Sequence, residues 1–289
     1  MRATFSAILT KAEKDQMDLR RYSLTKRQIE TAAGVLNYQP FIVSDDLQTG
    51  VAHSWLYGAE GGRLARSGDF VCRRESVSSE VWKNFVEANG ALRAMYEDWL
   101  DAICAPYRGG TLLDPACNNG YFLSGALKRG MKAATGYDRA DYTHSVQFLN
   151  EVTGTRAKFF HQAYSPWTHT IENCQPHDVA VASLIICHIS DPLYFLSFLG
   201  KKAREAIFLF TGMATDPGYR VYYTKPNKFY TSDEFPVCFD NDVALSKDLL
   251  YDGLAMMGFK NIKVLPHRET WLPMSWYGLG SQQAILATR

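Results

Sequence analysis

Two acidic residues stand at the ends of consecutive apolar strand patterns, where a carboxylate can take part in ligand binding. Asp114 ends TLLD, and Asp138 ends AATGYD about 20 residues further along the chain. In an open α/β sheet, ligands bind outside the carboxyl ends of the strands, and an acid after the second strand accepts hydrogen bonds from ribose hydroxyls. The pair therefore predicts a site for a ligand that contains a ribose.

The residues between Asp114 and the next helix pattern form a turn of mostly small side chains. The stretch is PACNNGYF, with Ala116, Asn118 and Gly120 where a dinucleotide-binding fingerprint would have glycines. Alanine narrows the space for close backbone approach, whereas asparagine can adopt a left-handed conformation. The glycine pattern alone is weak, so the prediction depends on the second acid.

Alternating strand and helix patterns place these residues at one edge of a sheet. Several of the strand patterns are apolar almost throughout, which predicts a parallel sheet covered on both faces. We expect the last two strands to form an antiparallel edge. The expected strands are 111–114, 133–138, 157–163, 178–186, 206–212, 260–267 and 282–289, and the expected helices are 121–129, 144–153, 192–203 and 246–258.

The pattern changes near residue 109, which predicts two parts of the chain. Residues 1–108 are expected to form an N-terminal extension or cap, with a helix over 78–103 that leads into the core. Residues 109–289 are expected to form a doubly wound α/β domain. Residues 214–241 are rich in Tyr, Pro and Phe and interrupt the alternation, so they predict an inserted lid.

These motifs resemble those of the class I S-adenosylmethionine-dependent methyltransferases. The matching stretches are LLDPACNNGYF, TGYD, HDVAVASLIICHISDPLYFL and ALSKDLLYDGLAMMGFKNIKVL, within residues 80–289. The resemblance implies a Rossmann-like, seven-stranded methyltransferase sheet that binds S-adenosyl-L-methionine and releases S-adenosyl-L-homocysteine. The CNNGYF turn and the ICHISDPLYFL segment look most like a branch with tRNA wobble-uridine methyltransferases and many small-molecule and sugar methyltransferases.

The resemblance also implies which residues bind the cofactor. The family usually has an acid near the adenine after its third strand, where this chain has Gln162, whose amide can also hydrogen-bond the adenine edge. The implied cofactor-binding residues are Asp114, Ala116, Cys117, Asn118, Gly120, Tyr121, Asp138, Arg139, Gln162, Ala163, Ser183 and Leu184.

His188 follows the fourth expected strand, whose end faces the transferred methyl group in this family. A histidine there can remove a proton from an acceptor hydroxyl, and the alternative is a hydrogen-bonded structural residue. We expect Asp191 to cap the helix that begins at Pro192. Four aromatic residues could line a substrate pocket or lid, or simply pack the insertion against the sheet. They are Tyr222, Tyr223, Tyr230 and Trp276.

Composition narrows the classes of partner. Lys and Arg number 31 and Asp and Glu 30, so net charge gives no general attraction to nucleic acid or to anionic membranes. The six cysteines contain no CxxC pair and the histidines lack metal-ligand spacing, which argues against a zinc site and a disulfide framework. We expect a cytoplasmic protein with a small-molecule substrate and no membrane association. A dimer is compatible with the sequence, which does not determine the oligomeric state.

The leading hypothesis is a methyltransferase that acts on an oxygen or nitrogen of a small molecule or sugar-like metabolite. Such a reaction needs orientation, desolvation and an optional base, so no catalytic triad is expected. One alternative is a tRNA substrate, which the branch resemblance suggests although the sequence lacks a strongly basic character. Adenine-N6 DNA methylation is disfavoured, because IICHISDP replaces the Pro-Pro-aromatic motif of those enzymes. A cofactor-binding scaffold without activity is the other alternative, suggested by the replaced glycines.

Overall fold

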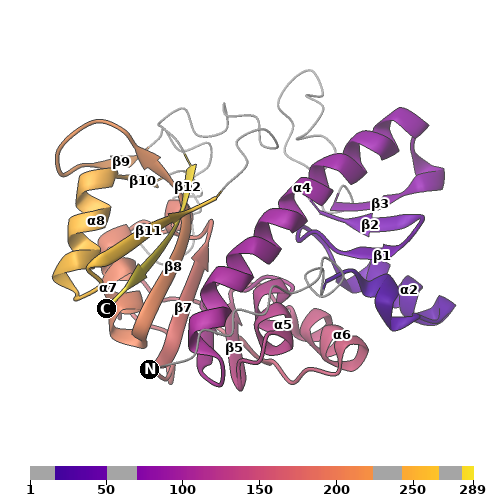
Figure 1. Cartoon of the computed structure of the whole chain (residues 1–289), viewed down its shortest axis with the longest axis horizontal. Coiled ribbons are helices and arrows are strands. Elements are labelled where there is room, and N and C mark those ends of the chain that lie inside the picture. Colours follow the sequence, from indigo (N-terminus) through magenta and orange to yellow (C-terminus); the bar gives the residue numbers. More distant parts are fainter. Residues whose placement is uncertain (1–16, 51–69, 224–242, 267–281) are drawn as a thin grey trace, which may run out of the picture. The chain divides into compact units, whose positions relative to one another are not determined.

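The computed structural model describes residues 17–50, 70–223, 243–266 and 282–289. The chain divides into two compact units, Met1–Asp98 and Trp99–Arg289. The boundary between them falls inside the long helix α4, which covers Ser79–Cys104 (Figure 1). The division of function near residue 109 stays a prediction, and each unit is described by itself.

The first unit contains a small antiparallel sheet in the order β1-β2-β3. Its helix α2 begins at a capping box, in which Thr25 and Gln28 satisfy each other's backbone N–H groups. Arg73 on β3 forms an ion pair with Glu30 on α2 (2.7 Å). The elements are α2 (Lys26–Val35), β1 (Ile42–Ser44), β2 (Leu47–Thr49), β3 (Val71–Arg73) and α4 as far as Asp98.

The second unit carries the large sheet and the helices that cover it. Its strands are β4 (Thr111–Asp114), β5 (Ala133–Asp138), β6 (Lys158–His161), β7 (His177–Ser183), β8 (Ala203–Ala214), β9 (Val221–Tyr223), β10 (Val243–Ser246), β11 (Asn261–Leu265) and β12 (Gln282–Thr288). Its helices are the end of α4, α5 (Tyr121–Lys128), α6 (Thr143–Thr153), α7 (Pro192–Lys202) and α8 (Lys247–Met256).

Seven strands of this sheet follow the order β11-β12-β8-β7-β4-β5-β6. The strands from β8 to β6 run parallel to one another, and β12 is antiparallel to both β8 and β11. This is the strand order of the methyltransferase fold, so the expected Rossmann-like architecture is confirmed. The expected antiparallel pair is present at one edge of the sheet, where β11 is the outermost strand and β12 lies between β11 and β8.

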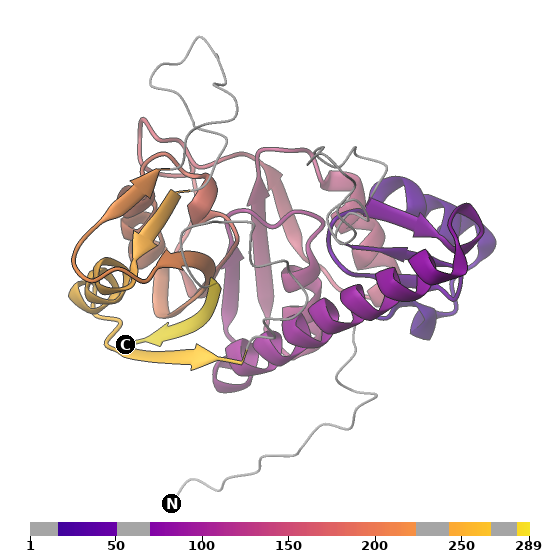
Figure 2. The same cartoon turned by 90° about the horizontal axis from the view of Figure 1, so that it is seen from above.

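Strand β8 carries large apolar side chains on both of its faces, so helices must cover the sheet on both sides. Phe208 and Phe210 project to one face, where both rings pack against Trp99 near the end of α4 (centroids 5.4 and 4.6 Å apart). Ile207 and Leu209 project to the other face, because neighbouring residues of a strand point in opposite directions. Figures 1 and 2 show α5 and α6 on one side of the strands and α7 and α8 on the other.

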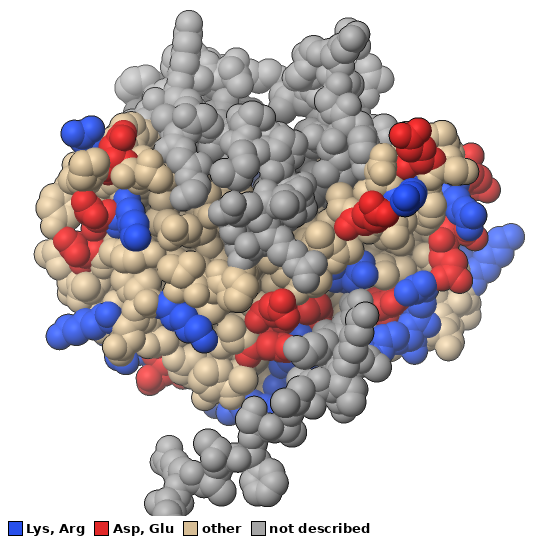
Figure 3. Space-filling model, turned by 45° about the horizontal axis from the view of Figure 1, so that its top comes forward, with Lys and Arg blue, Asp and Glu red and all other residues tan. Residues whose placement is uncertain are grey.

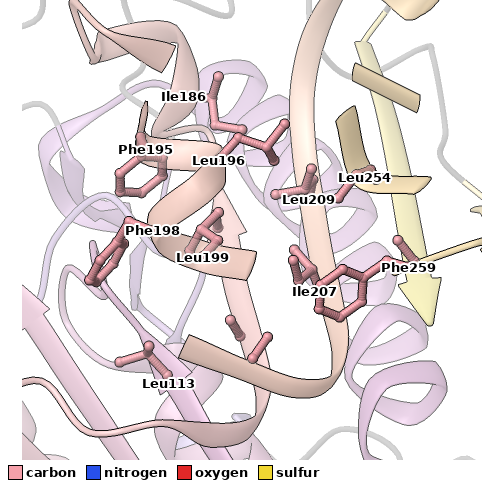
Figure 4. Close-up of a cluster of buried hydrophobic side chains, with 14 of the residues drawn as sticks. Leu113, Ile186, Phe195, Leu196, Phe198, Leu199, Ile207, Leu209, Leu254 and Phe259 are labelled. Carbon is pink, nitrogen blue, oxygen red and sulfur yellow. The ribbon is translucent and has the colours of Figure 1, made fainter. Parts of the chain in front are cut away.

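The core under α7 and α8 is dominated by large aliphatic and aromatic side chains (Figure 4). Full burial of one such side chain contributes about 1.5 to 3 kcal/mol, so this cluster fixes both helices on the sheet. The carboxyl ends of the parallel strands are thereby held at one edge. The labelled members are Leu113, Ile186, Phe195, Leu196, Phe198, Leu199, Ile207, Leu209, Leu254 and Phe259.

Two connections depart from a simple alternation of strands and helices. The segment 162–176, which is described throughout, joins β6 to β7 by turns and a short bridge between Ser165 and Thr170, without a helix. Strand β9 of the expected insertion pairs with β10, which follows the insertion, and β10 pairs in parallel with the end of β8. The described parts of the insertion therefore extend the sheet at its carboxyl edge.

Candidate functional site

Asp114 is the last residue of β4 and lies at the centre of the sheet's carboxyl edge. Its carboxylate is almost fully buried, and its Oδ1 accepts a hydrogen bond from the backbone N–H of Ala116 (3.1 Å). Burial raises the pKa of Asp114 to about 7, the Ala116 hydrogen bond opposes this shift, and the charge of Asp138 adds to it. Asp114 can therefore hold or release a proton near neutral pH.

The turn after Asp114 is tied to the end of the next strand through Asp138. The backbone N–H of Asn118 donates to Asp138 Oδ2 (2.9 Å), and the N–H of Ala140 donates to Oδ1 (3.0 Å). The N–H of Cys117 also donates to the carbonyl of Tyr137 (3.0 Å). Asp138 thus fixes the turn itself, and each of its oxygens still has a lone pair for a ligand hydroxyl.

The turn uses the left-handed backbone conformation at two positions. Asn118 has φ 49° and Gly120 has φ 87°, so asparagine does adopt the left-handed conformation that is open to this residue type. Gly120 is the N-cap of α5, and a Cβ there would lie 3.0 Å from a methyl group of Val146. The following Tyr121 is fully buried.

Cys117 lies in the turn between the two acids and is fully buried. Burial raises the pKa of its thiol well above the usual value, and the charges of Asp114 and Asp138 act in the same direction. The thiol therefore stays protonated and fills space beside Gly136 of β5. Ala116 is half-buried and lies in the same turn.

The ends of β5 and β6 are joined beside Asp138. An isolated bridge pairs Asp138 with Gln162, and the imidazole Nε2 of His161 donates to the carbonyl of Arg139 (2.9 Å). Arg139, Gln162 and Ala163 are exposed. The structure therefore brings these three predicted residues next to the ribose-binding candidate, at the edge that remains open to solvent.

The end of β7 offers a second group for a ligand. Ser183 Oγ is buried and has no hydrogen-bond partner among the described residues. Leu184 follows with φ 54°, and its N–H donates to the carbonyl of Phe210 on β8 (2.7 Å). A buried hydroxyl without a partner is uncommon in a folded protein, so a ligand donor or acceptor at this strand end would satisfy it.

His188 is exposed and ends the short 3-10 helix Ile186–His188, which follows β7. This 3-10 helix lies against β10, and β9 pairs with β10. Tyr222 on β9 is half-buried, and its hydroxyl donates to Asp216 (2.9 Å). His188 and β9, the strand that carries Tyr222, thus lie at the same edge of the sheet. Tyr223 is on the same strand, whereas Tyr230 and Trp276 lie outside the described residues.

A cluster that the sequence did not predict lies between the loop after β6 and the start of α7. Asp191 Oδ2 accepts hydrogen bonds from Tyr164 Oη (2.9 Å) and His169 Nδ1 (3.0 Å), and the His169 ring stacks on Tyr194 (centroids 3.9 Å). The expectation that Asp191 caps α7 is wrong for its side chain, which makes no capping hydrogen bond. The Asp191 carboxylate accepts hydrogen bonds from Tyr164 and His169 instead.

Two classes of site are not found in the part of the chain that the structure describes. No described group of three or more His, Cys, Asp or Glu side chains is placed to hold a metal ion. Among the described helices, none combines the length and the apolar character needed to cross a membrane.

Comparison with known proteins gives a structural likeness without a sequence relative. No family model matches the chain, and no curated protein matches it. The N-terminal domain of EvdMO1, in the presence of S-adenosylhomocysteine and D-fucose, is 14% identical with a TM-score of 0.49, over 67% of this chain and 82% of that one.

Two further solved structures are enzymes named as methyltransferases. Magnesium protoporphyrin IX methyltransferase from Synechocystis, with bound S-adenosylmethionine, is 14% identical (TM-score 0.46, 70% of this chain and 83% of that one). The 1,6-didemethyltoxoflavin-N1-methyltransferase from Burkholderia thailandensis is 14% identical (TM-score 0.44, 87% and 99%). At these sequence identities and TM-scores the likeness shows only the class of fold. The strand order establishes that class by itself. The structural neighbours are class I S-adenosylmethionine-dependent methyltransferases.

Proposed function

We propose that this chain is an S-adenosylmethionine-dependent methyltransferase that methylates an oxygen or nitrogen of a small molecule. The observation that carries the proposal is the pair of acids at the carboxyl ends of the neighbouring strands β4 and β5, with the turn after Asp114 held by the Asn118 N–H on Asp138. In this strand order, that edge is where a nucleotide-like ligand binds. Asp138 would accept hydrogen bonds from the ribose hydroxyls, and the turn would hold the amino-acid part.

The residues at this edge fit the proposed cofactor in three respects. Asp114 is a buried acid beside the turn, which suits a ligand that carries positive charge. Gly120 has no side chain, so the space between the turn and Val146 stays open; a Cβ at this position would fill it. Ser183 Oγ is a buried hydroxyl that still needs a partner.

The chain's own contribution to the reaction would be mainly positional. When bound, the cofactor supplies a methyl group on a sulfonium. Asp138 and the turn after Asp114 would hold it so that an acceptor's lone pair could take the methyl group, with the electron pair of the carbon–sulfur bond left on sulfur. Holding the two groups in line can replace several kcal/mol of activation free energy, so the strand ends need only orient the groups and exclude water. His188 is the proposed acceptor of the nucleophile's proton.

The insertion strands are the proposed source of substrate selectivity. Tyr222 and Tyr223 lie on β9, which reaches the carboxyl edge through β10 and the end of β8. A small molecule suits this placement, with Tyr230 and Trp276 as further proposed contacts. Lys and Arg side chains are interspersed with Asp and Glu on the face in Figure 3, which favours a small molecule over tRNA.

Calorimetric titration with S-adenosylhomocysteine tests the proposal. Wild-type protein should bind it, and Asp138→Ala should weaken binding at least about tenfold, because a hydrogen bond to a charged group contributes roughly 1.5 to 3 kcal/mol. Asp141→Asn is the matched control. Asp141 is an exposed acid three residues further on, and its carboxylate accepts hydrogen bonds from Thr143 in its own loop, with the N–H at 2.9 Å.

The outcomes separate an enzyme from a scaffold. Wild-type protein that binds neither S-adenosylmethionine nor S-adenosylhomocysteine would contradict the proposal. Equal losses of affinity in Asp138→Ala and Asp141→Asn would show that the ribose lies elsewhere. Binding without methyl transfer to any member of a broad hydroxyl and amine library would favour the non-catalytic alternative.

A further inference from the structure

The imidazole of His177 is buried at the amino end of β7 and makes two hydrogen bonds. Its Nδ1 lies 2.8 Å from the carbonyl oxygen of Gln175, and its Nε2 lies 3.0 Å from the hydroxyl oxygen of Thr135 on β5. A carbonyl oxygen can only accept, so Nδ1 must carry a proton, and Nε2 of the neutral ring accepts the proton of the Thr135 hydroxyl. The two hydrogen bonds therefore define a neutral imidazole with its proton on Nδ1.

This ring connects two parts of the second unit that do not pair as strands. Gln175 belongs to the segment 162–176, called the crossover below, which joins β6 to β7 without a helix. Thr135 lies on β5, and β4 separates β5 from β7 in the sheet. Three side chains of the crossover are buried in the hydrophobic cluster under α7, and they are Tyr164, Ile171 and Cys174. His177 thus joins the end of the crossover to the sheet that it covers.

A second proton on the His177 ring would disturb this arrangement. The new N–H at Nε2 would point at the Thr135 oxygen, so the hydroxyl proton would have to turn away. Among the described residues, no other acceptor is placed for that proton. His177 and Thr135 are each only 8% exposed, so water has little access to either group. A buried charge and a buried donor without an acceptor both destabilise the latched arrangement.

The surroundings of His177 act on balance against its charged form. Burial is the largest cause that lowers the pKa of His177 below the ordinary value of 6.5, and the hydrogen bond with Gln175 opposes it. The charges of Arg204 at the start of β8 and Lys158 at the start of β6 lower the pKa further. Asp178, the next residue on β7, raises it, but this carboxylate also lies 3.4 Å from the Arg204 guanidinium.

We propose that His177 is an acid-sensitive latch, which holds the end of the crossover to β5 when its ring is neutral and releases it when the ring is protonated. The released form takes up a proton near pH 6.5, whereas the latched form takes it up only at lower pH. Acid therefore favours release: the stabilisation by the latch is present above about pH 6.5 and is lost as pH falls through the lower pKa of the folded chain. Because no ligand takes part, the latch is independent of the proposed function.

Hydrogen exchange measured by mass spectrometry at about pH 7.5 and about pH 5 tests the latch. After correction for the intrinsic pH dependence of exchange, wild-type protein should lose protection in peptides from the crossover. The loss should be about tenfold for each pH unit by which the folded-state pKa lies below 6.5. Peptides from α5 serve as an internal reference, because global unfolding would affect them as well. In His177→Gln the loss should be absent, since an amide stays neutral at both pH values.

His144→Gln is the matched control, because His144 is an exposed histidine on α6. This variant should keep the wild-type loss of protection. Asp114 also titrates near neutral pH, but it lies at the opposite ends of the parallel strands and is present in all three proteins, so its effect cancels in the comparison. Wild-type protection that is equal at both pH values would overturn the latch, as would an equal loss in wild type and His177→Gln.

An NMR titration of the wild-type imidazole gives a second measurement, which decides the question even if His177→Gln does not fold. The neutral ring of His177 should carry its proton on Nδ1, and it should titrate below pH 6.5 over the same range in which the crossover loses protection. A neutral ring with its proton on Nε2, or a titration at or above pH 6.5, would show that His177 does not act as the latch.

Discussion

Asp114 links the protonation state of the site to the stability of the fold. Its pKa is about 7 in the folded chain against 3.8 as the ordinary value, so the folded state holds a proton that the unfolded state has lost between these values. The stabilisation is complete below about pH 4 and is lost as pH rises through about 7. A cationic ligand near Asp114 would oppose this loss by favouring the ionised form.

We predict that Asp114→Asn removes this pH dependence. Asparagine stays neutral, so between about pH 4 and 7 the variant should gain stability relative to wild type, by up to roughly 4 kcal/mol. Chemical denaturation of both proteins at several pH values, without ligand, measures the difference. A difference that stays constant across this range would show that Asp114 is already ionised in the folded chain.

The role of His188 can be separated from a structural one. If His188 accepts the proton of an acceptor hydroxyl, His188→Ala should lower the single-turnover rate by about 10² to 10⁴ and leave S-adenosylmethionine affinity nearly unchanged. His188→Gln should not restore the rate. If His188→Ala lowers both the melting temperature and the cofactor affinity, and His188→Gln partly restores them, then His188 is a structural residue instead.

The predictability of the site differs from residue to residue. Asp114 and Asp138 could be found because each ends a strand pattern, and the spacing along the chain carries the information. The hydrogen bonds of Asp191 could not be found in this way. Its partners Tyr164 and His169 are 27 and 22 residues away, in a loop whose path depends on tertiary packing. The preference of aspartate for helix N-caps predicted instead that its side chain would cap α7, and this prediction is wrong.

At the scale of elements, β5 approaches the turn so closely that it needs a glycine. A Cβ on Gly136 would lie 2.5 Å from both Cys117 Sγ and a methyl group of Leu123. We predict that Gly136→Ala lowers the free energy of unfolding by about 1 to 3 kcal/mol and weakens S-adenosylhomocysteine binding, because the turn must move. Denaturant titration and calorimetry measure the two effects.

Gly90 provides the matched control for that substitution. It lies within α4, and a Cβ there would meet nothing within 4 Å. Gly90→Ala should leave S-adenosylhomocysteine affinity unchanged and add about 0.5 to 1 kcal/mol of stability, since alanine is the better helix former. A Gly136→Ala protein as stable as wild type would mean that the turn tolerates displacement.

The elements themselves were predicted well where one pattern determines the structure. The helices expected over 121–129, 192–203 and 246–258 appear as α5, α7 and α8, because caps, prolines and apolar periodicity mark their ends. The antiparallel edge formed by the last two strands was also predicted, but their order within it was not. The apolar sequence of β12 is compatible with either an edge or an internal strand, and only pairing with β8 decides between them.

At the scale of the whole molecule, ligand binding should stabilise the second unit. At a concentration 100 times its dissociation constant, S-adenosylhomocysteine should add about 2.7 kcal/mol. Each kcal/mol raises the melting temperature by roughly 2 to 4 °C in a domain of this size. Calorimetric scans with and without ligand measure the shift. If two transitions are resolved, the one that moves belongs to the unit that binds the ligand.

Because β12 lies inside the sheet, the sheet can be completed only after β12 has been synthesised. β12 pairs with β8, about 75 residues earlier in the chain, and with β11, and it separates these two strands in the sheet. Because the ribosome releases residues in order, β4 to β8 can assemble first, while β8 keeps one row of backbone groups unpaired until β12 emerges. For that interval, β8 is an exposed apolar edge that can pair with the wrong strand.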